Sequence, residues 1–456
     1  MAHTDHRAPL PPAPAHDGLH LRNLLPSVLA ALSVTGPRPI VADSFSFASA
    51  QAQPGDGEPG SRIGGEQLLA DGGFTNLLGV PEASIAVVLM VDGLGDAQLA
   101  RYSGHARFLA AARRSMSSSA VLDTGMPTTT AASLASLGTG LSPGQHGLVG
   151  YDVLDPERDR VVNMLGSWDP EVDPRQWQPH PSLLTWAADS GARVLTASRP
   201  AFEHSALTQA ALDGGEFRGA TRMDARFTHA IAWIQQQREG AGSLRRGPRP
   251  PVLVYLYVDE LDKTGHKYGV ASEQWLTMLE TLDTQAARLC EELRSRFGQQ
   301  ASVLLTADHG MVDIAPDQRF DIAHRPELLH GVRHTAGEPR MVQLHMEHEE
   351  SHPAHSQALE TTRAAWQEEF GDRAWVLTRQ EAVDAGWFGT VTPGVRRRIG
   401  DLIIAARAPI AIFDTSRTGT KPLAMVGQHG SLTDQERQVP LLELTGGALG
   451  AAQALA

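Results

Sequence analysis

Three apolar runs in the chain have the character of strands that are buried on both faces. They occupy residues 85–96, 251–262 and 301–310, and each opens with near-continuous Val, Leu and Ile before it reaches an acidic residue. Strands of parallel sheets have this composition because helices cover both faces of such a sheet. We therefore expect the three runs to lie in one mostly parallel sheet.

A helix is predicted between the second and third runs. Its apolar positions recur at intervals of three and four residues, which gives one stripe that faces the core. These positions are Trp275, Leu279, Leu282, Ala286, Leu289 and Leu293. Strand, helix and strand in this order predict a crossover unit, and hence an α/β fold.

Less regular segments divide the rest of the chain. The pattern over residues 21–34 predicts one amphipathic helix, whereas the Pro-rich residues 8–16 are expected to be extended. Residues 50–65 are rich in Gly and Pro and are expected to form a linker, and 236–251 a second flexible connection. We predict four units: an N-terminal arm, helix and linker (1–80), a core (81–312), an inserted cap (313–420) and a last core segment that carries His429 (421–456).

Acidic residues follow the predicted strands at comparable positions. Asp92, Asp262 and Asp308 each fall at or just beyond the end of an apolar run. Ligands of open parallel sheets bind outside the carboxyl ends of the strands, so we expect the three carboxylates to converge there. Taken singly, each Asp has a simpler interpretation as a helix cap or as part of an Asx turn.

Histidines accompany these aspartates. Asp262 and His266 are four residues apart, Asp308 precedes His309, and glycines flank the pair Gln428–His429. Imidazole and carboxylate groups suit zinc or a comparable divalent cation. Two such ligand sets predict a bimetallic centre, in which cations about 4 Å apart act on the attacking and leaving oxygens of a phosphoryl displacement.

A candidate nucleophile lies in residues 120–147. This segment predicts a strand, a Pro-containing turn and a short helix that begins near Thr130 and stops at Gly138 or Gly140. A hydroxyl at a helix N-terminus lies beside unpaired backbone N–H groups, which stabilise an alkoxide or a phosphate oxygen. The alternative is an ordinary helix cap, because Ser and Thr are favoured there regardless of function.

Composition narrows the range of partners and ligands. The chain has 52 acidic and 39 basic residues and a formal net charge of −13, which argues against nonspecific nucleic-acid binding. Its one cysteine, Cys290, excludes an internal disulfide and a thiolate metal cage, and we expect it to pack inside the predicted helix. No apolar stretch reaches about 18 residues and no secretory signal is evident, so we expect a cytoplasmic protein with no membrane partner.

The motifs together resemble the alkaline phosphatase superfamily and, within it, the type I phosphodiesterase/nucleotide pyrophosphatase family. The resemblance covers residues 85–150, 251–312 and 424–440. The matching positions are Asp92, Pro127, Thr128, Thr130, Thr139, Gly140, Leu141, Pro143, His146, Gly147, Asp262, Gly265, His266, Asp308, His309, Gly310, His429 and Gly430. The resemblance implies a three-layer α/β sandwich with a mostly parallel central sheet and an inserted cap.

The resemblance also implies two metal sites and a covalent mechanism. One cation would be bound by Asp262, His266 and His429, and the other by Asp92, Asp308 and His309 together with the Thr130 oxygen. Zinc is expected, with manganese or iron as alternatives. Thr130 would attack phosphorus and form a phosphothreonine that water then hydrolyses, so the expected substrate is a small-molecule phosphate ester or phosphonate.

Two positions depart from the family pattern. The pyrophosphatase branch has an aromatic residue directly after the nucleophile and an asparagine three residues after it, whereas this chain has Ala131 and Ser133. Ser133 is a candidate donor to a phosphate oxygen, with a shorter reach than asparagine. Nucleotide specificity is therefore open, although phosphoester or phosphonate hydrolysis is still expected.

Several alternatives remain beside the phosphodiesterase interpretation. A phosphonoacetate-hydrolase-like enzyme or a phosphomonoesterase would use the same metals and Thr130. A phosphomutase would usually have manganese and a serine nucleophile, and a sulfatase would need a Cys or Ser in a context that neither Cys290 nor Thr130 has. A non-catalytic metal-binding scaffold is the remaining class.

Charged residues of the predicted cap have less specific interpretations. His345, His348, His352 and His355 are expected to lie in or near a solvated charged loop over 346–357. Arg333, His334 and Arg340 are expected to face solvent rather than substrate. Residues 400–414 are expected to provide one strand of the cap.

Overall fold

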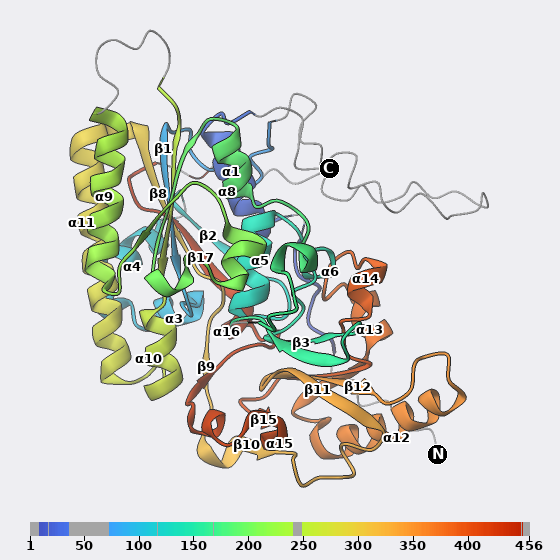
Figure 1. Ribbon diagram of the computed structural model, residues 1–456. Coiled ribbons are helices and arrows are strands. Elements are labelled where there is room, and N and C mark those ends of the chain that lie inside the picture. Colours follow the sequence, from blue (N-terminus) through green and yellow to red (C-terminus); the bar gives the residue numbers. More distant parts are fainter. Residues whose placement is uncertain are drawn as a thin grey trace.

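A seven-stranded sheet forms the centre of the chain in the computed structural model, which describes residues 9–16, 18–35, 73–115, 117–166, 168–239, 249–447 and 449 (Figure 1). In spatial order its strands are β2 (Ser119–Asp123), β17 (Gln438–Glu443), β8 (Ala301–Thr306), β1 (Ile85–Val91), β7 (Val252–Val258), β5 (Arg193–Ser198) and β6 (Glu216–Gly219). The five strands from β8 to β6 are parallel, and β17 runs antiparallel to both of its neighbours.

The three predicted strands are adjacent in the middle of this sheet. β1 pairs with β7 on one side and with β8 on the other, so that Ile85 lies opposite both Val252 and Ala301. Every residue of the three strands is buried, as their continuous apolar sequences require. The mostly parallel central sheet is thus confirmed.

Helices cover both faces of the sheet. One face carries α4 (Arg107–Arg114), α9 (Met223–Glu239) and α11 (Glu273–Phe297), and the other carries α1 (Leu24–Ala31), α5 (Thr130–Thr139) and α8 (Leu183–Asp189) (Figure 1). α11 is the predicted crossover helix: Ser272 caps it by accepting from the Trp275 N–H, and its whole predicted stripe is buried. Cys290 packs beside that stripe, and its burial raises the pKa of the thiol to about 12. The three-layer α/β sandwich is confirmed.

A second sheet of six antiparallel strands lies beside the C-terminal ends of the central strands (Figure 1). Its order is β13 (Ala374–Thr378), β14 (Leu402–Ala406), β12 (Met341–Met346), β11 (Val332–Glu338), β3 (Asp152–Asp155) and β4 (Arg160–Asn163). α12 (Pro353–Phe370) packs on this sheet and contributes Trp366 and Phe370 to a separate apolar cluster. The second sheet therefore combines residues 152–163 with strands from the 313–420 interval, and the division of the chain into four units remains a prediction.

Short elements connect the two sheets. β10 (Arg319–Asp321) pairs with β15 (Ala411–Phe413), and β9 (Val312–Asp313) pairs with β16 (Gly427–Gln428). The remaining α-helices that the described residues form are α3 (Asp96–Arg101), α6 (Pro143–His146), α7 (Pro174–Trp177), α10 (Glu260–Tyr268), α13 (Arg379–Asp384), α14 (Pro393–Arg396), α15 (Thr415–Thr418) and α16 (Asp434–Arg437). Residues 400–414 supply two strands, β14 and β15, where one was expected.

Several segment predictions need correction. The expected amphipathic helix over 21–34 is a 3-10 turn followed by α1, and α1 is buried on almost all sides, where it packs against α5 and α8. The expected connection over 236–251 begins later, since α9 continues to Glu239, and the expected linker 50–65 lies outside the described residues. In the expected loop 346–357, α12 already begins at Pro353.

Two of the cap residues expected to be solvated are buried. His345 lies on β12, a central strand of the second sheet, and is 3% exposed, and His355 is 5% exposed on α12. Arg340, expected to face solvent, is 1% exposed and forms an ion pair with Glu436 at 2.6 Å. A buried arginine requires such a partner, and α16 supplies it from a part of the sequence almost 100 residues away.

The N-terminal arm lies against the folded body. The Trp375 indole N–H donates to the Pro9 carbonyl, and the Asn23 amide donates to the His16 carbonyl. None of the helices in the part of the chain that the structure describes is long and apolar enough to cross a membrane.

Candidate active site

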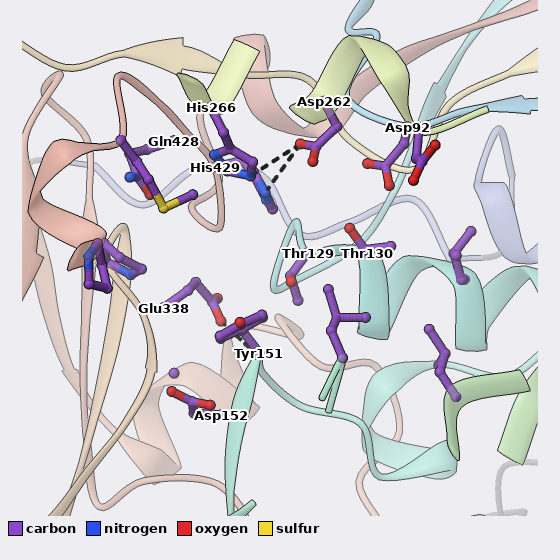
Figure 2. Close-up of a pocket in the computed structure, with 18 of the residues that line it drawn as sticks. Asp92, Thr129, Thr130, Tyr151, Asp152, Asp262, His266, Glu338, Gln428 and His429 are labelled. Carbon is purple, nitrogen blue, oxygen red and sulfur yellow. Dashed lines mark hydrogen bonds and ion pairs between the residues drawn. The ribbon is translucent and has the colours of Figure 1, made fainter. Parts of the chain in front are cut away.

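The carboxyl ends of three adjacent strands bring the predicted site residues together. Asp92 follows β1, Asp308 and His309 follow β8, and Asp262 lies in the first turn of α10, directly after β7. Because β1 lies between β7 and β8, these ends meet at one edge of the sheet. His429 lies in the segment directly after β16. Figure 2 shows it facing Asp262, across from Thr130.

One group of candidate ligands consists of Asp92, Asp308 and His309. The His309 Nε2 lies 3.4 Å from Asp92 Oδ1 and 3.5 Å from Asp308 Oδ2, and all three residues are buried. Thr130 Oγ1 lies 3.1 Å from the same nitrogen. Ligand atoms of the three residues lie within 4.8 Å of one another, which is close enough for one cation to reach all of them.

A second group surrounds Asp262. Its Oδ1 lies 3.2 Å from His266 Nε2 and 3.9 Å from His429 Nε2. Asp262, His309 and His429 also offer ligand atoms within 4.8 Å of one another, so His309 borders both groups. The His309 and His429 rings are stacked with their centroids 3.5 Å apart, which makes the two groups neighbours.

Backbone carbonyls orient the three histidines in the same way. The Nδ1 atoms of His266, His309 and His429 lie 2.8, 3.0 and 2.8 Å from the carbonyl oxygens of Gly427, Gly310 and Thr128. A carbonyl oxygen accepts a hydrogen bond, so in the neutral ring Nδ1 carries the proton and the lone pair lies on Nε2, which in His309 accepts from the Thr130 hydroxyl. This arrangement is common for histidines that bind metals through Nε2.

The buried carboxylates also fit divalent cations. Asp92 Oδ1, Asp262 Oδ1 and Asp308 Oδ2 are buried and have no hydrogen-bond donor. Burial raises the pKa of Asp92 well above its ordinary value, and the carboxylates of Asp308 and Asp262 raise it further. Burial likewise raises the pKa of Asp308 and lowers that of His429, which keeps this imidazole neutral and able to bind a metal. Cations bound here would supply the positive charge that these oxygens lack.

Gly93 allows two of these segments to approach closely. Its backbone has a φ of +76°, and a Cβ at this position would lie 3.0 Å from the Cα of Asp262. Its N–H donates to Asp308 Oδ1 at 3.1 Å. The glycine after Asp92 therefore connects the ends of all three central strands.

Thr130 begins α5 and lines the cavity in front of both groups (Figure 2). The first N–H groups of a helix have no carbonyl partners within it, so the Thr130 hydroxyl lies at the positive end of α5. The helix ends at Gly140, whose φ is +72°, as the sequence predicts. Ser133 is fully buried one turn further on, its hydroxyl has no hydrogen-bond partner, and it does not line the cavity.

Tyr257 belongs to the site although sequence reasoning missed it. Its hydroxyl donates to Asp92 Oδ2 from the end of β7, and burial raises the pKa of the phenol well above its ordinary value. The signal in the sequence is the pair Tyr255 and Tyr257, whose spacing places both side chains on one face of the strand. Both residues line the cavity.

Ion pairs hold the start of α10, which carries Asp262. Arg199 contacts Asp259 at 2.5 Å and Glu260 at 3.2 Å, and the fully buried Arg226 also pairs with both acidic residues. Lys263 contacts Asp259 at 2.5 Å. These contacts connect the β7–α10 turn to β5 and α9 and limit how far Asp262 can move.

A cavity of about 400 Å³ extends from the candidate ligands to the second sheet. Its walls include apolar side chains and several polar residues that Figure 2 labels. The apolar set includes Leu134, Phe202, Leu207, Leu212 and Phe217, and the polar set includes Tyr151, Asp152, Glu338 and Gln428. The cavity is large enough for a small organic phosphate.

The chain is similar to known phosphodiesterases in sequence and to a solved structure in fold. Venom phosphodiesterase 2 of Crotalus adamanteus is 28% identical over 193 residues, which is 42% of this chain and 22% of that protein. Ectonucleotide pyrophosphatase/phosphodiesterase family member 3 of Bos taurus is 26% identical over 41% of this chain and 20% of that protein, so the matches span about a fifth of these relatives. The structure of murine ectonucleotide pyrophosphatase/phosphodiesterase 5 has the same fold, with a TM-score of 0.58 and 15% identity over 78% of this chain and 87% of that one.

A family model covers most of the chain. The model that describes type I phosphodiesterase / nucleotide pyrophosphatase matches residues 86–432, which include every candidate metal ligand and Thr130. With the strand order and the cluster of carboxylates and histidines already described, this match identifies the chain as a member of the type I phosphodiesterase/nucleotide pyrophosphatase family, a family of phosphoester hydrolases.

Proposed function

We propose that the chain is a two-metal phosphodiesterase that acts through a covalent phosphothreonine on Thr130. The observation that carries the proposal is the position of the Thr130 hydroxyl, at the N-terminus of α5 and 3.1 Å from His309 Nε2. No other hydroxyl of the described residues is hydrogen-bonded to a candidate histidine ligand. The family and the cavity support hydrolysis of a small phosphate ester.

Two zinc ions would occupy the groups already described. Asp92, Asp308 and His309 would hold one ion, and Asp262, His266 and His429 the other, with His309 at the border between them. Such ions would lower the pKa of a nearby hydroxyl and neutralise the charge that develops on phosphate oxygens.

The residues of the chain would divide the reaction into two displacements. In the first, the Thr130 oxygen attacks phosphorus and loses its proton to solvent, while the bond from phosphorus to the leaving alkoxide breaks and the alkoxide takes up a proton from solvent. In the second, a water oxygen attacks the phosphothreonine and loses a proton to solvent, the bond between phosphorus and the Thr130 oxygen breaks, and the threonine oxygen takes up a proton from solvent. The N-terminus of α5 would stabilise negative charge in both steps.

A parallel assay of zinc-loaded protein tests this function. We expect hydrolysis of bis(p-nitrophenyl) phosphate to exceed that of p-nitrophenyl phosphate and of phosphonoacetate, and to fall by at least about a thousandfold in Thr130→Ala. Thr281→Ala is the matched control, because its hydroxyl lies on the exposed side of α11. Wild-type protein that is acid-quenched during turnover of bis(p-nitrophenyl) phosphate should carry a p-nitrophenyl phosphoryl group on Thr130 that mass spectrometry locates. Equal rates for wild type and Thr130→Ala would disprove the covalent mechanism.

A further inference from the structure

Glu338 presents an unsatisfied carboxyl oxygen to the cavity. The residue ends β11, is 6% exposed and lines the same cavity as Thr130. Its Oε2 accepts the Tyr151 backbone N–H at 2.9 Å, whereas the buried Oε1 has no hydrogen-bond partner. A buried carboxyl oxygen without a donor is costly, so a ligand that supplies a donor would be favoured there.

No basic side chain neutralises Glu338. Among the residues that the structure describes, no Lys, Arg or His forms an ion pair with it; Arg417 instead contacts Asp152 at 2.6 Å, and Arg340 contacts Glu436. Burial, together with the charges of Asp152 and Glu436, raises the pKa of Glu338 well above its ordinary value. A cation beside Oε1 would therefore stabilise the ionised carboxylate.

The wall around Glu338 is acidic as a whole. On the side of the second sheet, the charged residues that line the cavity are three carboxylates, Asp152, Glu338 and Asp414, and one guanidinium, Arg417. Asp152 pairs with Arg417, and Asp414 accepts the Thr335 hydroxyl at 2.6 Å, so both have protein partners. Among these three carboxylates, Glu338 is the one with a buried oxygen that has no hydrogen-bond donor.

Glu338 lies close to the candidate metal ligands. Gly430 directly follows His429, and a Cβ at this position would overlap Glu338 Cγ, so the glycine allows the carboxyl to pack against this segment. Figure 2 shows Glu338 beside Tyr151, and both residues line the same cavity as His429. A group bound to Glu338 would therefore be separated from a phosphate at the metal ligands by a short spacer.

We propose that Glu338 and the ring of Tyr151 form a cation subsite for phosphodiesters in which one alcohol carries a primary ammonium group. This proposal rests on the phosphodiesterase function and specifies its substrate class. A primary ammonium group provides the N–H donor that Glu338 Oε1 lacks, which a quaternary ammonium group does not. The Tyr151 side chain is 37% exposed and lines the cavity, where its ring can lie against the cation.

Calorimetry with two matched ligands tests the subsite without requiring turnover. The protein is zinc-loaded Thr130→Ala, and the ligands are 2-aminoethyl methyl phosphate and propyl methyl phosphate, which has the same length but no ammonium group. We expect about tenfold or tighter binding of the amino ligand, as for a buried charged hydrogen bond. Glu338→Gln in the same background should abolish this preference, whereas Glu349→Gln, at an exposed position, should retain it.

Each result is decisive. Equal affinities for the two ligands before mutation, or a preference that survives Glu338→Gln, would overturn the subsite. Equal weakening of both ligands by Glu338→Gln would also overturn it, because it would indicate a structural role or a contact to the phosphate. If Glu338→Gln does not fold, Tyr151→Leu retains the backbone N–H and should reduce the preference about threefold, and an unchanged preference would contradict the proposal.

The subsite and the proposed function fail in different ways. Selective binding of the amino ligand by a protein that hydrolyses no diester would disprove the function and retain the subsite. Hydrolysis of bis(p-nitrophenyl) phosphate by a protein that binds the two ligands equally would disprove the subsite and retain the function.

Discussion

Asp92 illustrates how single residues of the site depend on partners that the sequence does not place beside them. Its Oδ2 accepts the Tyr257 hydroxyl, and its Oδ1 lies 3.4 Å from His309 Nε2. Tyr257 lies 165 residues further along the chain, and a tyrosine in an apolar strand is an ordinary core residue unless the fold is known. Each of the predicted ligands could be located because it follows a strand or lies near glycine, whereas Tyr257 has no such signal.

Tyr257→Phe should weaken metal binding while the fold is retained. The change removes the Tyr257 hydroxyl, which donates to Asp92, and loss of such a supporting contact commonly lowers metal affinity about 10- to 100-fold. Competition between the protein and a chelator for zinc measures the effect. Tyr268→Phe is the control, because Tyr268 is 43% exposed on α10, and the same zinc affinity in both variants would show that the hydroxyl does not support Asp92.

Individual elements show where sequence patterns suffice and where they do not. β1, β7, β8 and α11 are apparent from the sequence because their apolar runs and stripes are long and fully buried. The second sheet is harder to predict, since β3 and β4 are four residues each and β3 pairs with β11, which begins almost 180 residues after β3 ends. His345 and Arg340 have polar sequence surroundings that suggest solvent, but His345 lies on β12 in the middle of this sheet and Arg340 is buried with Glu436 of α16.

The turn after β1 depends on glycine at position 93. Alanine in this left-handed conformation costs about 1 to 2 kcal/mol, and at Gly93 the added Cβ would also press on Asp262. We expect Gly93→Ala to lower both the midpoint of thermal unfolding and the zinc content per chain. Gly191→Ala is a matched control, since Gly191 has a φ of +89° but open space where the Cβ would lie.

The two variants distinguish the strain of a left-handed backbone at alanine from the steric contact between the added Cβ and Asp262. Gly191→Ala should lower the unfolding midpoint alone, because its turn between α8 and β5 touches no candidate ligand. Identical zinc content in Gly93→Ala and wild type would show that the close approach to Asp262 has no role in the site.

Across the whole molecule, the fold gathers negative charge at one edge of its central sheet. The formal net charge is −13, and three of the acidic residues are the partly or fully buried Asp92, Asp262 and Asp308. Without cations these carboxylates oppose folding, and with cations they stabilise the folded state. Stability should therefore depend jointly on metal and on pH.

The effect of Asp92→Asn on the stability of the fold should change sign when zinc is removed. With zinc, the variant should unfold at a lower temperature than wild type, because it loses a candidate ligand. Without zinc at pH 8, it should unfold at a higher temperature, because burial raises the folded-state pKa of Asp92 and stability is therefore lost as the pH rises from the unfolded pKa toward this raised value. At about pH 3, below the unfolded pKa of about 4, the carboxyl is neutral in both states and the difference should disappear.

Thermal unfolding with and without a chelator, at pH 8 and at about pH 3, measures all these differences. Asp189→Asn, at an exposed position on α8, should match wild type under every condition and so controls for the change from Asp to Asn. A zinc-free Asp92→Asn variant that is less stable than wild type at pH 8 would contradict the expectation. It would mean that the Tyr257 hydroxyl compensates the buried charge of Asp92 even when no cation is bound, since this hydroxyl is the protein donor that Asp92 retains.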